Sequence, residues 1–242
     1  MSESPPEPVN RVLRVASAAF AVVFALLVAS AVTEPAAQAA VSLGLVGAET
    51  TGQQVVRTLV QFAGFLAAVV GYLAITDQWG LVRLSRPTLR DAGLVVGGGI
   101  ALFAFQYGAL FALGQVGLTT GQNQAVVPAG DPVTYYLAMI AVSLFVVGPV
   151  EEALFRGAVQ GGLRRAFDAA PAIMLASLMF GLVHYPSVSG TPGQRWAYVA
   201  VVVVLGAVLG VLYERTGNVL VPGFAHGVYN AVIYVVLLAQ SL

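Results

Sequence analysis

Five ionisable side chains lie in stretches of this 242-residue chain that are otherwise apolar. Three belong to the segment Glu151-Glu152-Ala153-Leu154-Phe155-Arg156, and the other two are the chain's two histidines, His184 and His226. An ionisable group at the centre of a membrane helix costs about 2.5–3.5 kcal/mol on insertion scales, so groups that persist there usually have a function. Two carboxylates, two imidazoles and a guanidinium indicate a catalytic or ion-handling site.

Helical spacing predicts different roles for the two adjacent carboxylates. Glu152 and Arg156 lie at positions i and i+4, so on a helix they face each other and can form an ion pair. Glu151 lies about 100° around the helix from Glu152 and has no such partner in the segment. We interpret Glu152 and Arg156 as a structural pair and Glu151 as a free carboxylate, available as a base or a ligand. The alternative is a charged turn in water, but the glycines and arginines over 157–165 favour a helix boundary further along.

The histidines supply the complementary chemistry. His226 and Asn230 are also at i and i+4, so both project from one face of the last apolar segment. An imidazole beside a carboxamide suits metal ligation or the stabilisation of an oxyanion. Each element alone has a simpler interpretation: the pair as a polar contact between helices, and His184 as a histidine at a helix end. Only the three elements together favour a single site.

The elements that must position these residues are membrane helices. A spanning helix needs about 20 apolar residues, and the sequence predicts an all-α bundle of seven spans. Their predicted ranges are 12–33, 55–76, 92–114, 133–160, 169–185, 196–214 and 218–240. The polar connections are short, which predicts a single membrane domain over 1–242 in a multi-pass protein of the cell membrane.

The arginines predict which way the bundle faces. With the N-terminus in the cytoplasm, nine of the eleven basic residues lie toward the cytoplasmic side and two toward the other, as the positive-inside rule requires. The nine are Arg11, Arg14, Arg83, Arg86, Arg90, Arg156, Arg164, Arg165 and Arg215, and the two are Arg57 and Arg195. We therefore expect a cytoplasmic N-terminus and a C-terminus on the opposite side.

Depth in the membrane tests whether one site is feasible. With a rise of about 1.5 Å per residue, Glu151 lies about 20 Å from Arg164, His184 about 24 Å from Asp168, and His226 about 17 Å from Arg215. All three distances start from the same predicted boundary. Glu151, His184, His226 and Asn230 can therefore lie at one level within the bilayer.

Composition excludes several classes of protein. Hydrophobic residues make up 58% and charged residues 9% of the chain, whereas soluble domains carry roughly 25% charged residues. The absence of cysteine excludes disulfides and thiol catalysis, and a net charge of zero without a basic patch gives nucleic-acid binding no support. Within the membrane segments, Gly206-x-x-x-Gly210 predicts close helix packing, which we assign to the bundle interior in preference to a dimer contact.

Three motifs in this order resemble those of a known family. Glu151-Glu152-x-x-Phe155-Arg156, Phe180-x-x-x-His184 and His226-x-x-x-Asn230 resemble the motifs of the CAAX-protease and bacteriocin-processing family, CPBP, also called ABI. Type II CAAX prenyl endopeptidases belong to it. The resemblance covers about 133–240, which would be the catalytic core, and the first three helices carry no motif.

The resemblance implies an intramembrane peptidase and a role for each residue. Glu151 and His184 would activate the attacking water, His226 and Asn230 would hold the oxyanion, and Glu152 with Arg156 would support the site. Glu151, His184 and His226 are also a plausible set of zinc ligands with one open position. A metal-free reaction with Glu151 as general base fits the same residues, so both mechanisms stay open.

The expected function is endopeptidase cleavage of a membrane-associated or lipidated substrate, of which a prenylated CAAX-type peptide is one form. Besides that substrate, the expected partner is the lipid bilayer. A non-catalytic immunity or scaffold protein of the same family is the first rival, and alanine at the motif positions would leave its function intact. A proton- or cation-coupled transporter is the second rival, and the sequence has none of the internal repeats that many transporters show.

Overall fold

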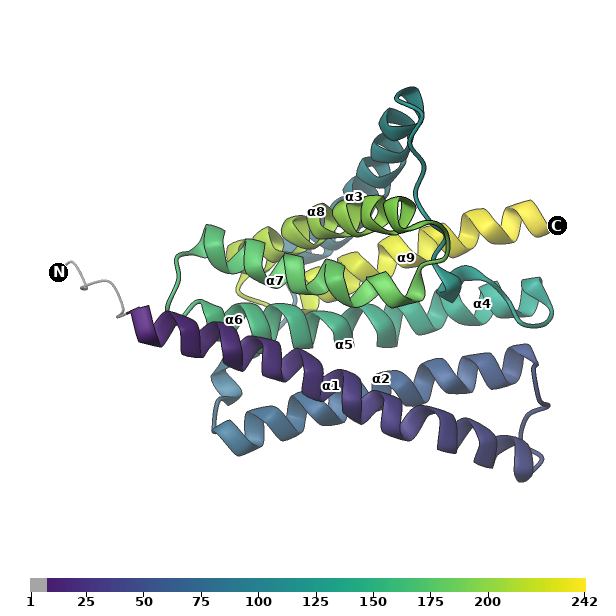
Figure 1. Ribbon diagram of the computed structural model, residues 1–242, viewed down its shortest axis with the longest axis horizontal. Coiled ribbons are helices and arrows are strands. Elements are labelled where there is room, and N and C mark those ends of the chain that lie inside the picture. The colour runs from purple at the N-terminus through teal and green to yellow at the C-terminus, as the bar shows by residue number, and fades with distance from the viewer. Residues whose placement is uncertain (1–7) are drawn as a thin grey trace.

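The computed structural model describes residues 8–242, and within them seven helices are long and apolar enough to cross a membrane (Figure 1). No strand occurs in this part of the chain, where the only β-type contact is an isolated bridge between Asn123 and Val188. The helices are α1 (Pro8–Ser42), α2 (Thr51–Thr76), α3 (Leu89–Gln115), α4 to α6 (Pro132–Leu163), α7 (Ala169–His184), α8 (Pro192–Thr216) and α9 (Leu220–Ser241). Short helical turns are η1 (Trp79–Leu81), η2 (Gln124–Val126) and η5 (Tyr185–Ser187). The predicted all-α fold with seven spans is confirmed.

The first helix is longer than the predicted span over 12–33. α1 continues past Pro35 to Ser42, whereas the other spans agree with the predicted ranges within a few residues. The extra turns lie beside α2: Glu34 forms an ion pair of 3.0 Å with Arg57 of α2, and Ala37 is fully buried. The prediction ended at the Thr-Glu-Pro run.

The fourth span changes its helical pitch around Glu151 and Glu152. It consists of α4 (Pro132–Val142), η3 (Ser143–Val147), α5 (Gly148–Glu152), η4 (Ala153–Gln160) and α6 (Gly161–Leu163), of which η3 and η4 have the wider π-helical turn. Pro149 lies at the start of α5. A proline inside a helix lacks an N–H donor and crowds the carbonyl four residues earlier, and the wider turn accommodates it. Such turns are frequent at functional sites.

Glycines bring α5 and α9 into backbone contact. A Cβ atom on Gly148 would collide with the carbonyl oxygen of Gly223 and lie 2.6 Å from the nitrogen of Gly227. A Cβ on Gly227 would in turn lie 2.8 Å from the Cα atom of Leu144. Small residues allow membrane helices to approach this closely. Because His226 directly precedes Gly227, this contact brings its ring beside the carboxylates of α5.

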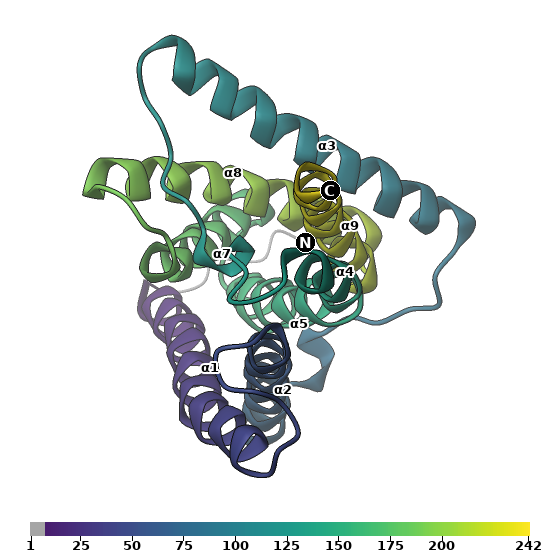
Figure 2. The ribbon, with the colours of Figure 1, turned by 90° about the vertical axis from the view of Figure 1, so that its right-hand side faces the viewer.

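The remaining helices surround this central pair. Seen end-on, α1 and α2 form a hairpin on one side of the bundle, and α3 crosses the opposite side against α8 and α9 (Figure 2). α7 packs on α8 and on η4. α1 begins at one end of the bundle and α9 finishes at the other, as an odd number of crossings requires (Figure 1).

Arginines gather at the end of the bundle where α1 begins. The guanidinium of Arg11 lies 5.7 Å from the ring centroid of Phe167, and that of Arg83 lies 4.5 Å from the ring of Tyr213. These contacts join the start of α1, the turn after α6, the connection after α2 and the end of α8. The grouping agrees with the arginine bias read from the sequence. A cytoplasmic location for this end stays a prediction.

Candidate active site

The ion pair expected between Glu152 and Arg156 is present in the centre of the bundle. Arg156 Nε lies 2.7 Å from Glu152 Oε2, and both side chains are fully buried. The η4 segment that carries Arg156 is π-helical, yet the two side chains still meet. A guanidinium keeps its proton in proteins, so its positive charge holds Glu152 as the carboxylate.

The Gly206-x-x-x-Gly210 pattern of α8 lies against the guanidinium of Arg156. A Cβ on Gly206 would lie 3.3 Å from Arg156 Nη2, and a Cβ on Gly210 would lie 3.3 Å from Nη1 and 2.8 Å from Gln160 Oε1. The two glycines of α8 therefore make room for the guanidinium and its neighbour. The assignment of this pattern to packing inside the bundle is confirmed.

Polar side chains connect Arg156 to the surface. Its Nη1 donates to Ser177 Oγ at 3.4 Å and to Gln160 Oε1 at 3.5 Å. Gln160 Nε2 donates in turn to Glu214 Oε1 at 2.9 Å, and Glu214 pairs with the exposed Arg164 at 3.3 Å. Arg156 Nη2 has no hydrogen-bond partner within residues 8–242. A chain of polar contacts thus runs from the arginine-rich end of the bundle to the buried ion pair.

His226 lies between the two adjacent carboxylates. Its Nδ1 is 3.1 Å from Glu152 Oε1, and its Nε2 is 3.8 Å from Glu151 Oε2. A carboxylate only accepts hydrogen bonds, so Nδ1 carries a proton and donates it to Glu152. Glu152 therefore orients His226 as well as pairing with Arg156, a link that the helical spacing alone did not predict. Glu151 faces the other nitrogen of the ring.

His184 is held in one tautomer by its own helix. Its Nδ1 lies 2.7 Å from the carbonyl oxygen of Phe180. Since a carbonyl oxygen can only accept, Nδ1 carries the proton and Nε2 of the neutral ring is a bare acceptor. The ring of Phe180 packs between the two histidines, with centroids 4.7 Å from His184 and 5.8 Å from His226. The Phe-x-x-x-His spacing thus places an aromatic side chain and a hydrogen-bond acceptor against the same imidazole.

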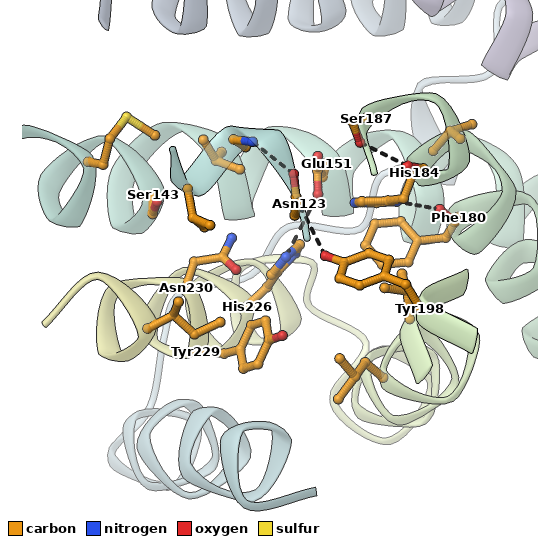
Figure 3. Close-up of a pocket in the computed structure, with 18 of the residues that line it drawn as sticks. Asn123, Ser143, Glu151, Phe180, His184, Ser187, Tyr198, His226, Tyr229 and Asn230 are labelled. Carbon is orange, nitrogen blue, oxygen red and sulfur yellow. Dashed lines mark hydrogen bonds and ion pairs between the residues drawn. The ribbon is translucent and has the colours of Figure 1, made fainter. Parts of the chain in front are cut away.

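The four predicted catalytic residues line one cavity of about 540 Å³. Glu151, His184, His226 and Asn230 come from α5, α7 and α9, and Figure 3 shows them around a common space. The Glu151 side chain is 17% exposed, whereas Glu152 is fully buried. The structure thus brings the four residues together around one cavity, and it gives the adjacent carboxylates different surroundings.

Comparison with known proteins adds an independent observation. Residues 133–232 match the family model described as type II CAAX prenyl endopeptidase Rce1-like. This segment of the chain is an Rce1-like domain. The uncharacterized protein YpbD of Bacillus subtilis (strain 168) is 34% identical over 82 residues, which are 34% of this chain and 36% of that protein. The match thus spans about a third of the relative's length, and no solved structure gave a significant match.

The Rce1-like domain includes the whole predicted constellation, from Glu151 to Asn230. It begins in α4 and ends in α9. The helices before it also contribute walls to the cavity, although they carry no motif: Leu26 of α1, Phe62 of α2 and Leu102 of α3 line it. The chain is a multi-pass membrane protein in which α1 to α3 help to enclose the site of the Rce1-like domain.

The predicted zinc ligands of the Rce1-like domain are not arranged as a metal centre. No three His, Cys, Asp or Glu side chains within residues 8–242 form a group that could hold a metal ion. Both ring nitrogens of His226 face carboxylates, and Nδ1 of His184 is bonded to a backbone carbonyl. Nδ1 contacts of this kind also occur in zinc-bound imidazoles. Glu151, His184 and His226 do not fit a three-ligand zinc site because these side chains are not grouped closely enough. Zinc binding stays a prediction.

Several polar residues of the cavity were not singled out from the sequence. Tyr198 of α8 accepts a hydrogen bond of 3.0 Å from Asn123 in the connection between α3 and α4. Tyr229 of α9 donates to Gln106 of α3. The signal that could have identified Gln106 is the one that identified the histidines, namely a polar side chain in an apolar helix. Asn123 lies in a polar loop, where the sequence has no comparable signal.

Proposed function

We propose that this protein is an intramembrane endopeptidase that hydrolyses a peptide bond of a membrane-associated or prenylated substrate. One observation carries the proposal: Glu151, His184, His226 and Asn230, from three helices of the Rce1-like domain, line a single cavity. The four groups supply a base, two imidazoles and an amide donor. Peptide hydrolysis needs this combination of proton transfer and oxyanion stabilisation.

The first step is the activation of water. Glu151 accepts a proton from a water molecule in the cavity, and the bare Nε2 of His184 accepts a second hydrogen bond that orients the same molecule. The water oxygen forms a bond to the carbonyl carbon of the substrate. The electron pair of the C=O π bond moves to the carbonyl oxygen, which becomes the oxyanion of a tetrahedral intermediate.

Stabilisation of the oxyanion is assigned to α9. Asn230 lines the cavity one helical turn beyond His226, and its amide N–H groups are donors that need no proton transfer. Two carboxylates beside one guanidinium leave one negative charge, which a doubly protonated His226 balances. Its Nδ1–H then donates to Glu152 and its Nε2–H to the oxyanion. Donors that are fixed in position before the reaction stabilise such a charge more than mobile water molecules do.

The last step completes the balance of protons. The electron pair of the oxyanion re-forms the C=O bond as the C–N bond breaks. The electron pair of that bond stays on nitrogen, and Glu151 returns to the nitrogen the proton that it took from water. The products are a carboxyl group on one peptide and an amine on the other. No step uses a metal, since Glu151, His184 and His226 are not grouped as a metal centre within residues 8–242.

The walls of the cavity support an apolar, membrane-borne substrate. Phe62 and Phe65 of α2 and Leu102 and Leu110 of α3 line it together with the polar groups of α9. A lipid chain or an apolar peptide segment beside these walls would bring an adjacent peptide bond to Glu151. Prenylated CAAX-type peptides are one class with this chemistry, and the name of the matched family points to it.

Cleavage assays on single variants test the proposal. Purified protein in liposomes is given fluorogenic peptides with and without a farnesylated cysteine before the last three residues. E151A, H184A and H226A should each lose nearly all cleavage, while circular dichroism shows an intact helical fold. Wild-type rates in all three variants would overturn the proposed function. Ion flux without cleavage would favour the transporter alternative. Absence of cleavage, together with binding of a partner that the alanine variants retain, would favour the non-catalytic immunity or scaffold protein.

A further inference from the structure

The connection between α3 and α4 lies against the cavity beside the His184 end of α7. Its residues Thr120, Gly121 and Asn123 line the cavity. Backbone contacts hold it in place: Asn123 and Val188 form an antiparallel bridge, and Ser189 N donates to the carbonyl oxygen of Gln122 at 2.9 Å. The segment that carries Asn123 is therefore anchored to the segment that follows His184.

Gly121 lets this connection approach closely. A Cβ atom at this position would collide with the carbonyl oxygen of Ser189, and Gly121 N donates to the carbonyl oxygen of Gln194 at 3.0 Å. Glycine alone fits such a backbone contact. The position of the Asn123 side chain relative to α8 is thus fixed by packing and hydrogen bonds on both sides.

The amide of Asn123 has one orientation. Its Oδ1 accepts a hydrogen bond of 2.9 Å from the backbone N–H of Ala125, so its Nδ2 is the atom that faces Tyr198. Nδ2 can only donate, and it donates to the Tyr198 hydroxyl oxygen at 3.0 Å. The phenolic proton of Tyr198 must therefore point elsewhere.

Tyr198 differs in this respect from the other tyrosines of the cavity. Tyr135 and Tyr234 donate their protons to the carbonyl oxygen of Ala125, and Tyr229 donates to Gln106. Within residues 8–242, the hydrogen bond of the Tyr198 hydroxyl is the one that it accepts. Figure 3 shows this hydroxyl directed to the space shared by Glu151 and His226.

We propose that Tyr198 is a further catalytic residue, which donates its O–H to the carbonyl oxygen of the scissile peptide bond. The assignment rests on the proposed peptidase function and adds a third donor to those of His226 and Asn230. A phenol is neutral before and after this contact, so it stabilises the oxyanion without a proton transfer. The hydrogen bond that its oxygen accepts from Asn123 polarises the O–H and strengthens it as a donor.

The Y198F variant tests the contact directly. Cleavage of the fluorogenic peptides in liposomes should show kcat reduced about 10²–10³-fold, the usual effect of removing one oxyanion donor, with KM nearly unchanged. Y107F is the matched control, because Tyr107 is exposed on α3 and should keep wild-type kinetics. A rise in KM at unchanged kcat would overturn the assignment to the scissile carbonyl.

The N123D variant distinguishes a catalytic role of Tyr198 from a role in anchoring the connection between α3 and α4. In N123D, one carboxylate oxygen still accepts from Ala125 while the other accepts the phenolic proton of Tyr198, so the link between loop and α8 persists but its direction is reversed. If Tyr198 is catalytic, N123D loses kcat about as strongly as Y198F while its unfolding temperature stays near that of the wild type. If Tyr198 only anchors the loop, N123D keeps its activity, and the inference is wrong.

The outcomes also separate this inference from the function on which it rests. Wild-type cleavage that E151A abolishes and Y198F leaves intact would overturn the role of Tyr198 alone. Absence of cleavage by the wild type across the peptide set would overturn both. Loss of kcat in Y198F and N123D, with E151A inactive, supports both.

Discussion

Nδ1 of His226 lies 3.1 Å from Oε1 of Glu152, whose other oxygen lies 2.7 Å from the guanidinium of Arg156. The fully buried carboxylate of Glu152 thus accepts hydrogen bonds from both Arg156 and His226. It neutralises an arginine that has no contact with solvent, and it fixes the proton of an imidazole that faces the cavity. Stability and the proposed chemistry therefore depend on the same side chain, and suitable variants can separate them.

Removal of Glu152 should destabilise the fold. E152A leaves Arg156 as an uncompensated charge inside the bundle, and breaking a buried pair in this way costs about 3–5 kcal/mol. We expect a clearly lower unfolding temperature in detergent and a low yield of folded protein. The matched control is E34A, since Glu34 pairs with Arg57 at 3.0 Å but the two side chains are 50% and 42% exposed. An exposed pair contributes about 0–1 kcal/mol, and equal stability of the two variants would contradict the structural role of Glu152.

Replacement of both partners should restore the fold but not the activity. In E152L/R156M the pair is exchanged for apolar side chains of similar volume, which is often neutral or stabilising by about 1–4 kcal/mol. The ring of His226 nevertheless loses the acceptor of its Nδ1–H. We expect an unfolding temperature near that of the wild type and cleavage reduced by at least about 10²-fold, since a misoriented imidazole loses most of its catalytic effect. Wild-type cleavage by this double variant would show that Glu152 does not orient His226.

The contacts of Glu152 with Arg156 and with His226 also show what the sequence can and cannot predict. Glu152 and Arg156 are four residues apart on one helix, so helical geometry alone predicts their contact. Glu152 and His226 are 74 residues apart. Their contact depends on how α9 is rotated against α5, which the glycine contacts at Gly148 and Gly227 determine. Helix rise predicted the common depth of the site but contains no information on that rotation.

The same limit applies to the loop that carries Asn123. Apolar runs predict spans because the membrane requires about 20 apolar residues, whereas the path of a polar connection depends on the tertiary contacts at both of its ends. The hydrogen bond between Asn123 and Tyr198 joins residues 75 positions apart. The end of α1 was likewise missed because the prediction stopped at the Thr-Glu-Pro run, although the alanine-rich segment after Pro35 favours a helix.

The glycines of α8 should be intolerant of a methyl group. In G210A the new Cβ lies 2.8 Å from Gln160 Oε1 and 2.9 Å from Ile173 Cγ2, and overpacking of this kind costs about 1–3 kcal/mol. G97A is the control, because nothing lies within 4 Å of a Cβ at Gly97 on α3. Thermal unfolding should show a loss only for G210A. A loss that appears only at high protein-to-detergent ratio would instead assign Gly210 to a contact between copies.

Metal removal should leave the activity intact. Glu151, His184 and His226 are not grouped as a metal centre within residues 8–242. We expect cleavage to persist after dialysis against EDTA and 1,10-phenanthroline, with less than stoichiometric zinc by elemental analysis. Activity lost with chelator and recovered with zinc alone would establish the metal-dependent mechanism.

Asn230 should affect the transition state more than substrate binding. Its amide lines the cavity beside His226 and is assigned to the oxyanion. N230A should lower kcat about 10²–10³-fold at nearly constant KM, as removal of a single oxyanion donor does. N230D should be at least as inactive, because it places a carboxylate oxygen where a donor is needed. Its shape is close to that of asparagine, so its unfolding temperature serves as the control for the fold. An N230D variant that is more active than N230A would show that Asn230 accepts a hydrogen bond from the substrate and that the oxyanion is held elsewhere.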